Sequence, residues 1–153
     1  MILVVVDTNV VVSAVLSENG FPASILDLGA NKRIMMCVST EVLEEYEEVL
    51  RRPRLKLSLA RIEKAMELIR STSRIVRPRR KLELAADPDD NLFYECADAA
   101  GANFLITGNI KHFPSGHEST EIVTPRQFME RLGPVLFKAS RWYLVGFEEV
   151  PDV

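Results

Sequence analysis

The sequence predicts an α/β fold, a three-layer α/β/α sandwich with a central, mostly parallel sheet of about five strands. Short apolar runs end abruptly in polar residues at two places, 2–9 and 103–109. Segments with helical apolar periodicity alternate with these and other short apolar runs. Because strands that alternate with helices are joined by right-handed crossovers, they form a parallel sheet with helices on both faces.

The composition is that of a single globular domain. The chain has 153 residues, 47% of them hydrophobic and 27% charged, so a complete core is expected. With a net charge of −3, any nucleic-acid contact must come from a local basic patch. We expect residues 1–132 to form the domain. Residues 133–153, apolar but aperiodic, would extend it as a hairpin or as an arm that contacts a dimer partner.

Several features favour a cytoplasmic protein. Cys37 and Cys96 lie in apolar segments without paired-motif spacing, which is typical of buried free thiols. Met1 leads directly into the first apolar run without a basic segment or cleavage site, so we expect no secretory signal. No apolar stretch reaches the ~20 residues that span a bilayer, so we expect no membrane contact.

The first strand, residues 2–6, has no alternation of polar and apolar residues, as expected for a strand buried on both faces. It ends in Asp7, Thr8 and Asn9. Ligands of open α/β sheets bind at the carboxyl ends of such strands, which places Asp7 where chemistry is expected. The alternative is that Asp7 only caps the helix that follows.

The remaining elements follow from apolar periodicity, caps and prolines. The three consecutive valines that begin segment 10–16 leave helix and strand equally open there. We expect helices at 21–31, 41–52, 58–71, 87–100 and 125–132, and strands at 33–38, 74–76, 103–107 and 121–124.

The helix at 41–52 carries one acidic residue in a special position. Its buried stripe is formed by Val42, Leu43, Tyr46, Val49 and Leu50. At about 100° per residue, Glu44 and Glu48 point into water, whereas Glu45 lies on the border of the stripe. Glu45 can therefore turn toward the strand ends, and Glu41 and Glu47 are weaker competitors. Tyr46, like Phe93, has the spacing of a core residue.

The helix at 87–100 begins with a cluster of acids. Asp87 suits the N-cap, Pro88 the first helical position and Asp90 the third, and Gly101 ends the helix. The next strand ends in Thr107, Gly108 and Asn109, and we expect it to lie beside the strand that ends in Asp7.

Polar side chains from four segments are thus predicted to meet at one edge of the sheet: Asp7, Glu45, Asp90 and Asn109. Carboxylates forced together raise one another's pKa unless a cation neutralises them. Oxygen ligands without paired His or Cys suit Mg²⁺ or Mn²⁺, ions that serve phosphoryl chemistry. His112 lacks a partner histidine three or four residues away, which argues against its being a metal ligand.

These stretches resemble the PIN-domain family, and within it the stand-alone ribonuclease toxins of VapC type. The resemblance covers about residues 2–132 and rests on the order and spacing of several blocks. They are VVVDTNVVVSAVL, VSTEVLEEYEEVLRRP, DPDDNLFYECADAAGANFLITGN, and KHFP followed by IVTPRQFME.

The resemblance implies an endoribonuclease that hydrolyses phosphodiester bonds of single-stranded RNA with Mg²⁺ or Mn²⁺, and an antitoxin that restrains it. It implies that Asp7, Glu45 and Asp90 bind the metal and are catalytic, with Asp87 as the rival of Asp90. The supporting polar residues would be Asn9, Ser39 and Thr107, with Asn109 beside them. We expect a homodimer.

Asn109 departs from the family pattern, because many members carry a fourth carboxylate there. An amide supplies a neutral oxygen, so one metal ion is favoured over two. The same departure motivates an alternative: a non-enzymatic RNA-binding or protein-interaction module with a PIN-like fold and an incomplete metal site. A metal-dependent phosphatase would want a second Asp at position 9, which is Asn.

Basic residues gather in two clusters. The first comprises Arg51, Arg52, Arg54 and Lys56, and the second begins at Arg74 and is densest at Arg77, Arg79, Arg80 and Lys81. Solvated surface charge explains either cluster alone. In an acidic protein with an acidic site, the second cluster is the better candidate for guiding RNA phosphates.

Overall fold

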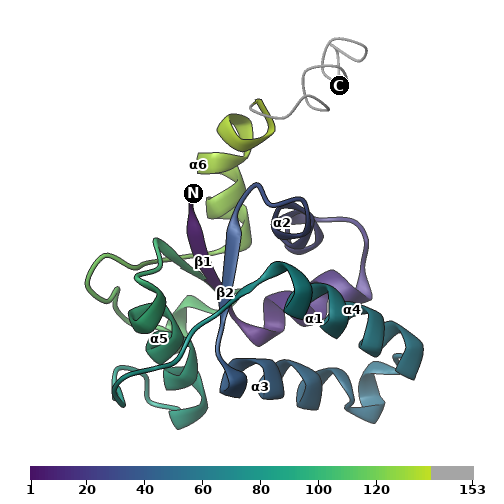
Figure 1. The fold of residues 1–153 in the computed structure, drawn as a ribbon, viewed down its shortest axis with the longest axis horizontal. Helices are drawn as coiled ribbons and strands as arrows, with labels where there is room; N and C mark the ends of the chain where they lie inside the picture. The colour runs from purple at the N-terminus through teal and green to yellow at the C-terminus, as the bar shows by residue number, and fades with distance from the viewer. Residues whose placement is uncertain (139–153) are drawn as a thin grey trace.

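The computed structural model describes residues 1–138 and confirms the predicted α/β sandwich (Figure 1). A five-stranded sheet has the order β3-β2-β1-β4-β5, and all of its pairings are parallel. Its strands are β1 (Leu3–Val6), β2 (Met35–Val38), β3 (Arg74–Ile75), β4 (Phe104–Ile106) and β5 (Glu121–Val123).

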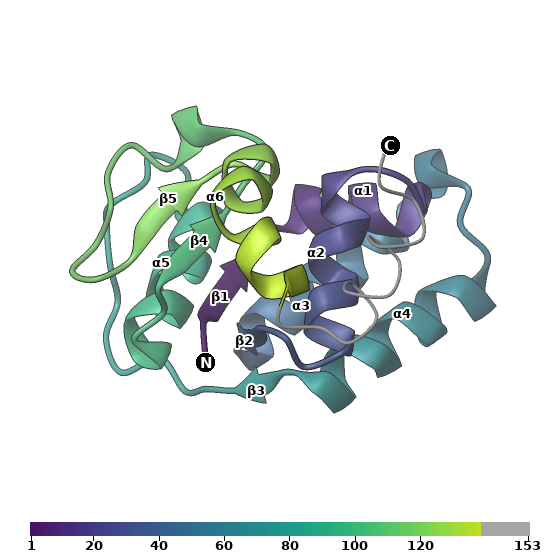
Figure 2. The same ribbon diagram turned by 90° about the horizontal axis from the view of Figure 1, so that it is seen from above.

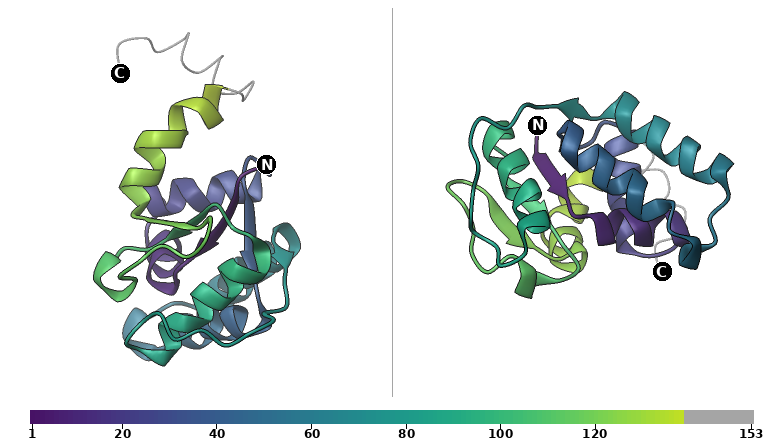
Figure 3. Two further views of the ribbon diagram at one scale, coloured as in Figure 1. Left: turned by 90° about the vertical axis from the view of Figure 1, so that its left-hand side faces the viewer. Right: turned by 90° about the horizontal axis from the view of Figure 1, so that it is seen from below.

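The helices lie on both faces of this sheet. Helices α2 and α6 lie in front of it when the molecule is seen from above (Figure 2), and α5 covers the opposite face, against β1, β2 and β4 (Figure 3, right). The helices are α1 (Thr8–Leu16), α2 (Phe21–Ala30), α3 (Thr40–Leu50), α4 (Leu59–Thr72), α5 (Pro88–Ala100) and α6 (Pro125–Lys138), with short 3₁₀ helices η1 (Pro53–Leu55) and η2 (Ile110–His112).

Strand β1 occupies the centre of the sheet, as its unbroken apolar run predicts. Val4, Val5 and Val6 are fully buried, between the two helical layers. Val6 pairs with Ile106 of β4, so the residues that follow these two strands come out side by side. The predicted adjacency of the two polar strand ends is therefore confirmed.

Two boundaries differ from the sequence prediction or resolve what it left open. The valine-rich segment is a helix, α1, because Asp7 caps its first turn and Val10 and Val11 are buried in the core. Helix α6 does not end at Leu132 but runs through Gly133 and Pro134 to Lys138. The prediction that the rest of the 133–153 segment forms a hairpin or a dimer arm falls on residues 139–153, outside the described ones.

Aromatic packing fixes the helices on the α5 face. Tyr46 of α3 lies 6.4 Å from Phe93 of α5, ring centre to ring centre, and Phe93 meets Phe113 edge-on at 6.3 Å. All three rings are buried, which confirms that Tyr46 and Phe93 are packing residues. Cys37 and Cys96 are both buried free thiols. None of the helices within residues 1–138 is long and apolar enough to cross a membrane.

Candidate metal centre

Asp7 is held at the carboxyl end of β1 from two directions. One carboxylate oxygen accepts from the Thr8 backbone N–H at 2.8 Å, so Asp7 is indeed the cap of α1. The other accepts from the Thr107 hydroxyl, also at 2.8 Å. Asp7 is only 6% exposed, and this burial raises its pKa although the two hydrogen bonds lower it. Asp7 therefore caps α1, and the same side chain lies at the carboxyl end of β1, where a metal ligand is predicted.

The residues that follow β4 lie beside Asp7 at this edge of the sheet. The Thr107 hydroxyl, besides donating to Asp7, accepts from the backbone N–H of Asn109 at 3.0 Å. The amide oxygen of Asn9 accepts from the Gly108 backbone N–H at 3.3 Å. Asn9 and Thr107 thus join the loop after β4 to the start of α1, which is a positioning role for both.

Glu45 faces the site from α3. It is half-buried, whereas its neighbours Glu44 and Glu48 are exposed, as the helical wheel predicts. Burial raises the pKa of Glu45 first, and the negative charges of Asp89, Glu48 and Asp7 raise it further. The next residue, Tyr46, donates its buried hydroxyl to the Val6 carbonyl and so fixes α3 against the end of β1.

Ser39 contributes to the site indirectly. Its buried hydroxyl accepts from the backbone N–H of Val42 at 3.1 Å and caps α3. The cap sets the start of the helix that carries Glu45.

Asp90 and Asp87, the alternative candidate for the metal ligand, have different roles in the structure. Asp87 is exposed and caps α5, accepting from the Asp89 backbone N–H at 2.9 Å. The Asp90 side chain is 16% exposed, and its pKa is raised to about 6 by burial, by the charge of Asp7 and by that of Asp87. The charge of Asp7 is the second cause after burial, so the two carboxylates are close enough to influence each other's protonation.

His112 joins the cluster, although sequence reasoning gave it little weight. Its Nδ1 lies 3.7 Å from a carboxylate oxygen of Asp90, and its Nε2 lies 3.1 Å from the side-chain nitrogen of Asn109. The short helix η2 brings the ring back toward the strand end. The spacing of three residues from Asn109 was the available sequence signal.

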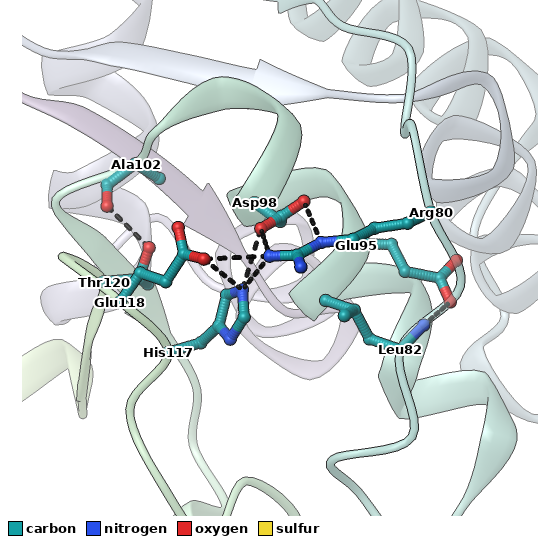
Figure 4. Close-up of polar contacts among 8 residues, drawn as sticks. All are labelled: Arg80, Leu82, Glu95, Asp98, Ala102, His117, Glu118 and Thr120. Carbon is teal, nitrogen blue, oxygen red and sulfur yellow. Dashed lines mark hydrogen bonds and ion pairs between the residues drawn. The ribbon is translucent and has the colours of Figure 1, made fainter.

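The predicted RNA-binding residues are not all near this edge. Arg80 pairs with Asp98 at 2.6 Å and with Glu118 at 2.9 Å (Figure 4). Lys81 lies 3.9 Å from Glu95. Asp98 is eight residues along α5 from Asp90, about 12 Å at 1.5 Å per residue. The structure therefore does not bring Arg80 and Lys81 to the acids. Arg77 and Arg79 are exposed.

Another cluster competes for a cation. Within residues 1–138, the ligand atoms of three acidic or histidine residues lie within 4.8 Å of one another only at Asp98, His117 and Glu118. Arg80 already neutralises that group, holding the pKa of Asp98 down to about 2, and Figure 4 shows its guanidinium between the carboxylates. The cluster is thus a closed ion-pair network between α5 and the loop before β5.

The donors around Asp7 fit a divalent ion better. Burial raises the pKa values of Asp7, Glu45 and Asp90, although the charge of Arg52 lowers that of Glu45 and the charge of His112 lowers those of Asp7 and Asp90. The buried Thr8 hydroxyl, next to Asp7, has no hydrogen-bond partner within the described part of the chain. Oxygen donors that repel one another are stabilised by a hard cation.

Comparisons with known proteins place this fold and site in a class. The family model of the PIN domain matches residues 3–111. The chain is 32% identical over 141 residues to the uncharacterized protein MJ1680 of Methanocaldococcus jannaschii, covering 84% of this chain and 90% of the relative. It also resembles a chain in the crystal structure of VapBC2 from Rickettsia felis bound to a DNA fragment from their promoter. That match has a TM-score of 0.55 and 20% identity, and covers 79% of this chain and 98% of the other.

The class is therefore that of the PIN-like α/β sandwiches, with acids at the carboxyl edge of the sheet. The chain belongs to the PIN-domain family, whose members are generally nucleases that use divalent metals. The likeness to VapBC2, at 20% identity, shows the fold alone.

Proposed function

We propose that this PIN-domain protein is a metal-dependent endoribonuclease that cleaves single-stranded RNA with Mg²⁺ or Mn²⁺. The observation that carries the proposal is that the charge of Asp7, at the end of β1, raises the pKa of Glu45 of α3 and of Asp90 of α5. Their raised pKa values mean that the pocket disfavours three bare anions. A pocket of this kind gains stability from a divalent cation, which is what hydrolysis of a phosphodiester needs.

In this proposal, Asp7, Glu45 and Asp90 hold the ion, and the Asn109 amide supplies a neutral oxygen at most. When bound, the ion supplies positive charge to the attacking water and to the phosphate oxygens. Thr107 keeps the Asp7 carboxylate oriented through its hydrogen bond. His112 lies beside Asp90 and partly offsets the negative charge of the pocket. With one formal charge missing at Asn109, one resting metal ion is favoured.

The RNA would approach along basic side chains. Of the four proposed RNA-binding residues, Arg77 and Arg79 are exposed and are the stronger candidates. Arg80 and Lys81 remain in the proposal only as a more distant contact, since both have acidic partners.

We further propose that the protein is the toxin of a toxin–antitoxin pair, a homodimer restrained by an antitoxin protein. Support comes from the PIN-domain match and from the fold it shares with a VapBC2 chain, a protein solved in complex with promoter DNA. Co-purification with the product of an adjacent reading frame would test this part separately from the chemistry.

The nuclease proposal is tested by cleavage of a fluorescent single-stranded RNA by the purified chain. Mn²⁺ or Mg²⁺ should support cleavage and excess EDTA should abolish it. Asp7→Asn and Glu45→Gln should be inactive with unchanged circular dichroism. Glu44→Gln is the matched control, because Glu44 is exposed one residue away on the same helix. Undiminished cleavage in EDTA, or by Asp7→Asn, would refute the proposal.

One observation favours the alternative of a non-enzymatic module that binds RNA or protein. Position 109 holds a neutral amide, and its nitrogen lies 3.1 Å from Nε2 of His112. Calorimetric titration distinguishes the two functions. Retained RNA affinity without any Mn²⁺ binding would favour the module, whereas Mn²⁺ binding that Asp90→Asn eliminates would favour the nuclease.

A further inference from the structure

A large cavity lies on the side of the molecule away from β4 and β5. It has a volume of about 510 Å³ and opens between α1, α2 and α4. Its walls are apolar, formed chiefly by Val15, Leu26, Met36, Leu68 and Ile69. Leu68 lines this cavity and is 45% exposed. We call this feature the α1–α2–α4 groove.

Charged side chains border the groove in an ordered way. Two exposed acids lie on one side, Glu18 between α1 and α2 and Asp27 on the α2 wall, and the exposed Arg61 and Lys64 lie on the α4 wall. Arg61 is oriented by a hydrogen bond to the Val15 carbonyl of α1. Going from α2 to α4, the surface therefore changes from acidic through apolar to basic.

We propose that the C-terminal segment of this same chain, residues 139–153, docks in the α1–α2–α4 groove. Its sequence, ASRWYLVGFEEVPDV, gives the complementary order of charges. Arg141 comes first and matches Asp27 of α2. The apolar residues Trp142 to Val145 follow and match the leucine-lined cavity. Glu148 and Glu149 come last and match the basic wall of α4.

The geometry permits this path. Helix α6, from which the segment continues, packs against α2, and α2 in turn contacts α1 and α4. Figure 2 shows α6 and α4 on opposite sides of α2. The segment must therefore cross one helix, about 10–12 Å wide. Fifteen residues span up to roughly 50 Å when extended, so the reach is ample.

Docking by the chain's own segment removes an unfavourable exposure. Burial of apolar side chains in the groove is stabilising in proportion to the area removed from water. The covalent connection makes the segment's effective concentration high, so it needs only modest affinity to occupy the groove. Any other polypeptide that uses the groove must then displace it.

Trp142 is the single tryptophan of the chain, so its fluorescence reports on this segment alone. In the full-length protein the emission should be blue-shifted and shielded from acrylamide. The variant Leu68→Asp should shift the emission to the red and raise the quenching constant severalfold. Leu59→Asp is the matched control, a comparably exposed leucine on α4 that does not line the groove, and it should change neither.

The charge order has its own test. Lys64→Glu should expose Trp142 partly, and adding Glu148→Lys with Glu149→Lys should restore the shielding. Rescue requires that the two regions meet, which a general loss of folding would not produce. Circular dichroism of each variant verifies that the fold persists.

Several outcomes would overturn the inference. One is a solvent-exposed Trp142 in the unmodified chain, and another is shielding that Leu68→Asp leaves intact. A third is shielding that disappears on dilution together with a fall in mass from dimer to monomer, which would assign the groove to a second copy's segment. Shielding that arises only when another protein is added would assign it to that partner. The supporting result is shielding that is independent of concentration and abolished by Leu68→Asp.

Discussion

The Thr107 hydroxyl donates a 2.8 Å hydrogen bond to Asp7, joining residues one hundred positions apart in the chain. The contact exists because β1 and β4 are parallel neighbours in register, with Val6 opposite Ile106. It fixes one oxygen of Asp7, and the start of α1 fixes the other. A carboxylate held in this way is preorganised for a ligand, and the first prediction concerns that hydrogen bond.

Replacing Thr107 by Val should reduce both stability and activity. The change leaves a buried Asp7 oxygen and the Asn109 N–H without their partner, which costs about 1–3 kcal/mol. Loss of a group that orients a metal ligand typically lowers metal affinity or activity about 10–100-fold. Urea denaturation and RNA cleavage measure the two effects.

Thr120→Val is the matched control. Thr120 is also buried, and its hydroxyl donates to the Ala102 carbonyl at 2.6 Å, away from the acids. It should lose stability by a similar amount and keep the Mn²⁺ affinity of the unmodified protein. Equal losses of Mn²⁺ affinity in both variants would contradict a positioning role for Thr107.

Asp90 rather than Asp87 should be required for metal binding. Asp90→Asn removes a carboxylate that interacts electrostatically with Asp7, so we expect loss of Mn²⁺ binding and of cleavage. Asp87→Asn keeps a good N-cap residue at the start of α5, so it should remain folded and active. Calorimetric titration of both variants with Mn²⁺ measures which carboxylate is required. If Asp87→Asn loses Mn²⁺ binding and Asp90→Asn keeps it, Asp87 is the ligand.

Without metal, the protein should lose stability as the pH rises through the acidic range. The pKa of Asp90 is raised from 3.8 to about 6, and those of Asp7 and Glu45 are raised in the same direction. At a pH between the ordinary pKa and the raised pKa of such a group, the folded state binds more protons than the unfolded chain. Deprotonation therefore favours unfolding. The part of the stability that is due to protonated Asp90 is complete below pH 3.8 and disappears as the pH rises through about 6.

Thermal denaturation in EDTA at several pH values measures this dependence. Asp90→Asn should flatten it, and added Mn²⁺ should raise stability most near neutral pH, where the carboxylates are charged. A metal-free stability that climbs steadily across the acidic range, equally in the Asp90→Asn variant, would show that folding does not raise the pKa of Asp90.

The arginines of the 77–81 run should have two different functions, RNA binding and stabilisation of the fold. Replacing Arg77 and Arg79 together by Gln should weaken RNA binding and make it less sensitive to salt. The log–log slope of affinity against salt should fall by about 0.7 for each phosphate that the protein no longer neutralises. Arg80→Gln should chiefly lower thermal stability, because Arg80 joins the segment before α5 to Asp98 and Glu118.

Fluorescence anisotropy at several salt concentrations gives these slopes for each variant. An effect of Arg80→Gln on RNA binding equal to that of the double variant would contradict the separation.

The sequence predicted the fold well because its strongest signals are local. The unbroken apolar run before Asp7 and the cap Asp87–Pro88 each specify an element without reference to the rest of the chain. The orientation of Glu45 followed from helical geometry alone. Valine propensity could not decide α1, because burial of Val10 and Val11 against the core stabilises the helix there.

Other features depend on interactions that local patterns do not contain. Gly133 and Pro134 suggested that α6 ends early, yet the helix continues through them. The basic run gave no sign that Arg80 meets Asp98 and Glu118, because those partners are 18 and 38 residues away. His112 reaches Asp90 only because η2 turns the chain back after β4.

Anomalous diffraction from a crystal soaked in Mn²⁺ would show whether Asp7, Glu45 and Asp90 bind one metal ion. We expect one anomalous peak within ligand distance of Asp7 and Asp90, with Glu45 turned toward it, and no such peak in the Asp7→Asn variant. A peak confined to Asp98, His117 and Glu118, or no peak at any soaking concentration, would contradict it.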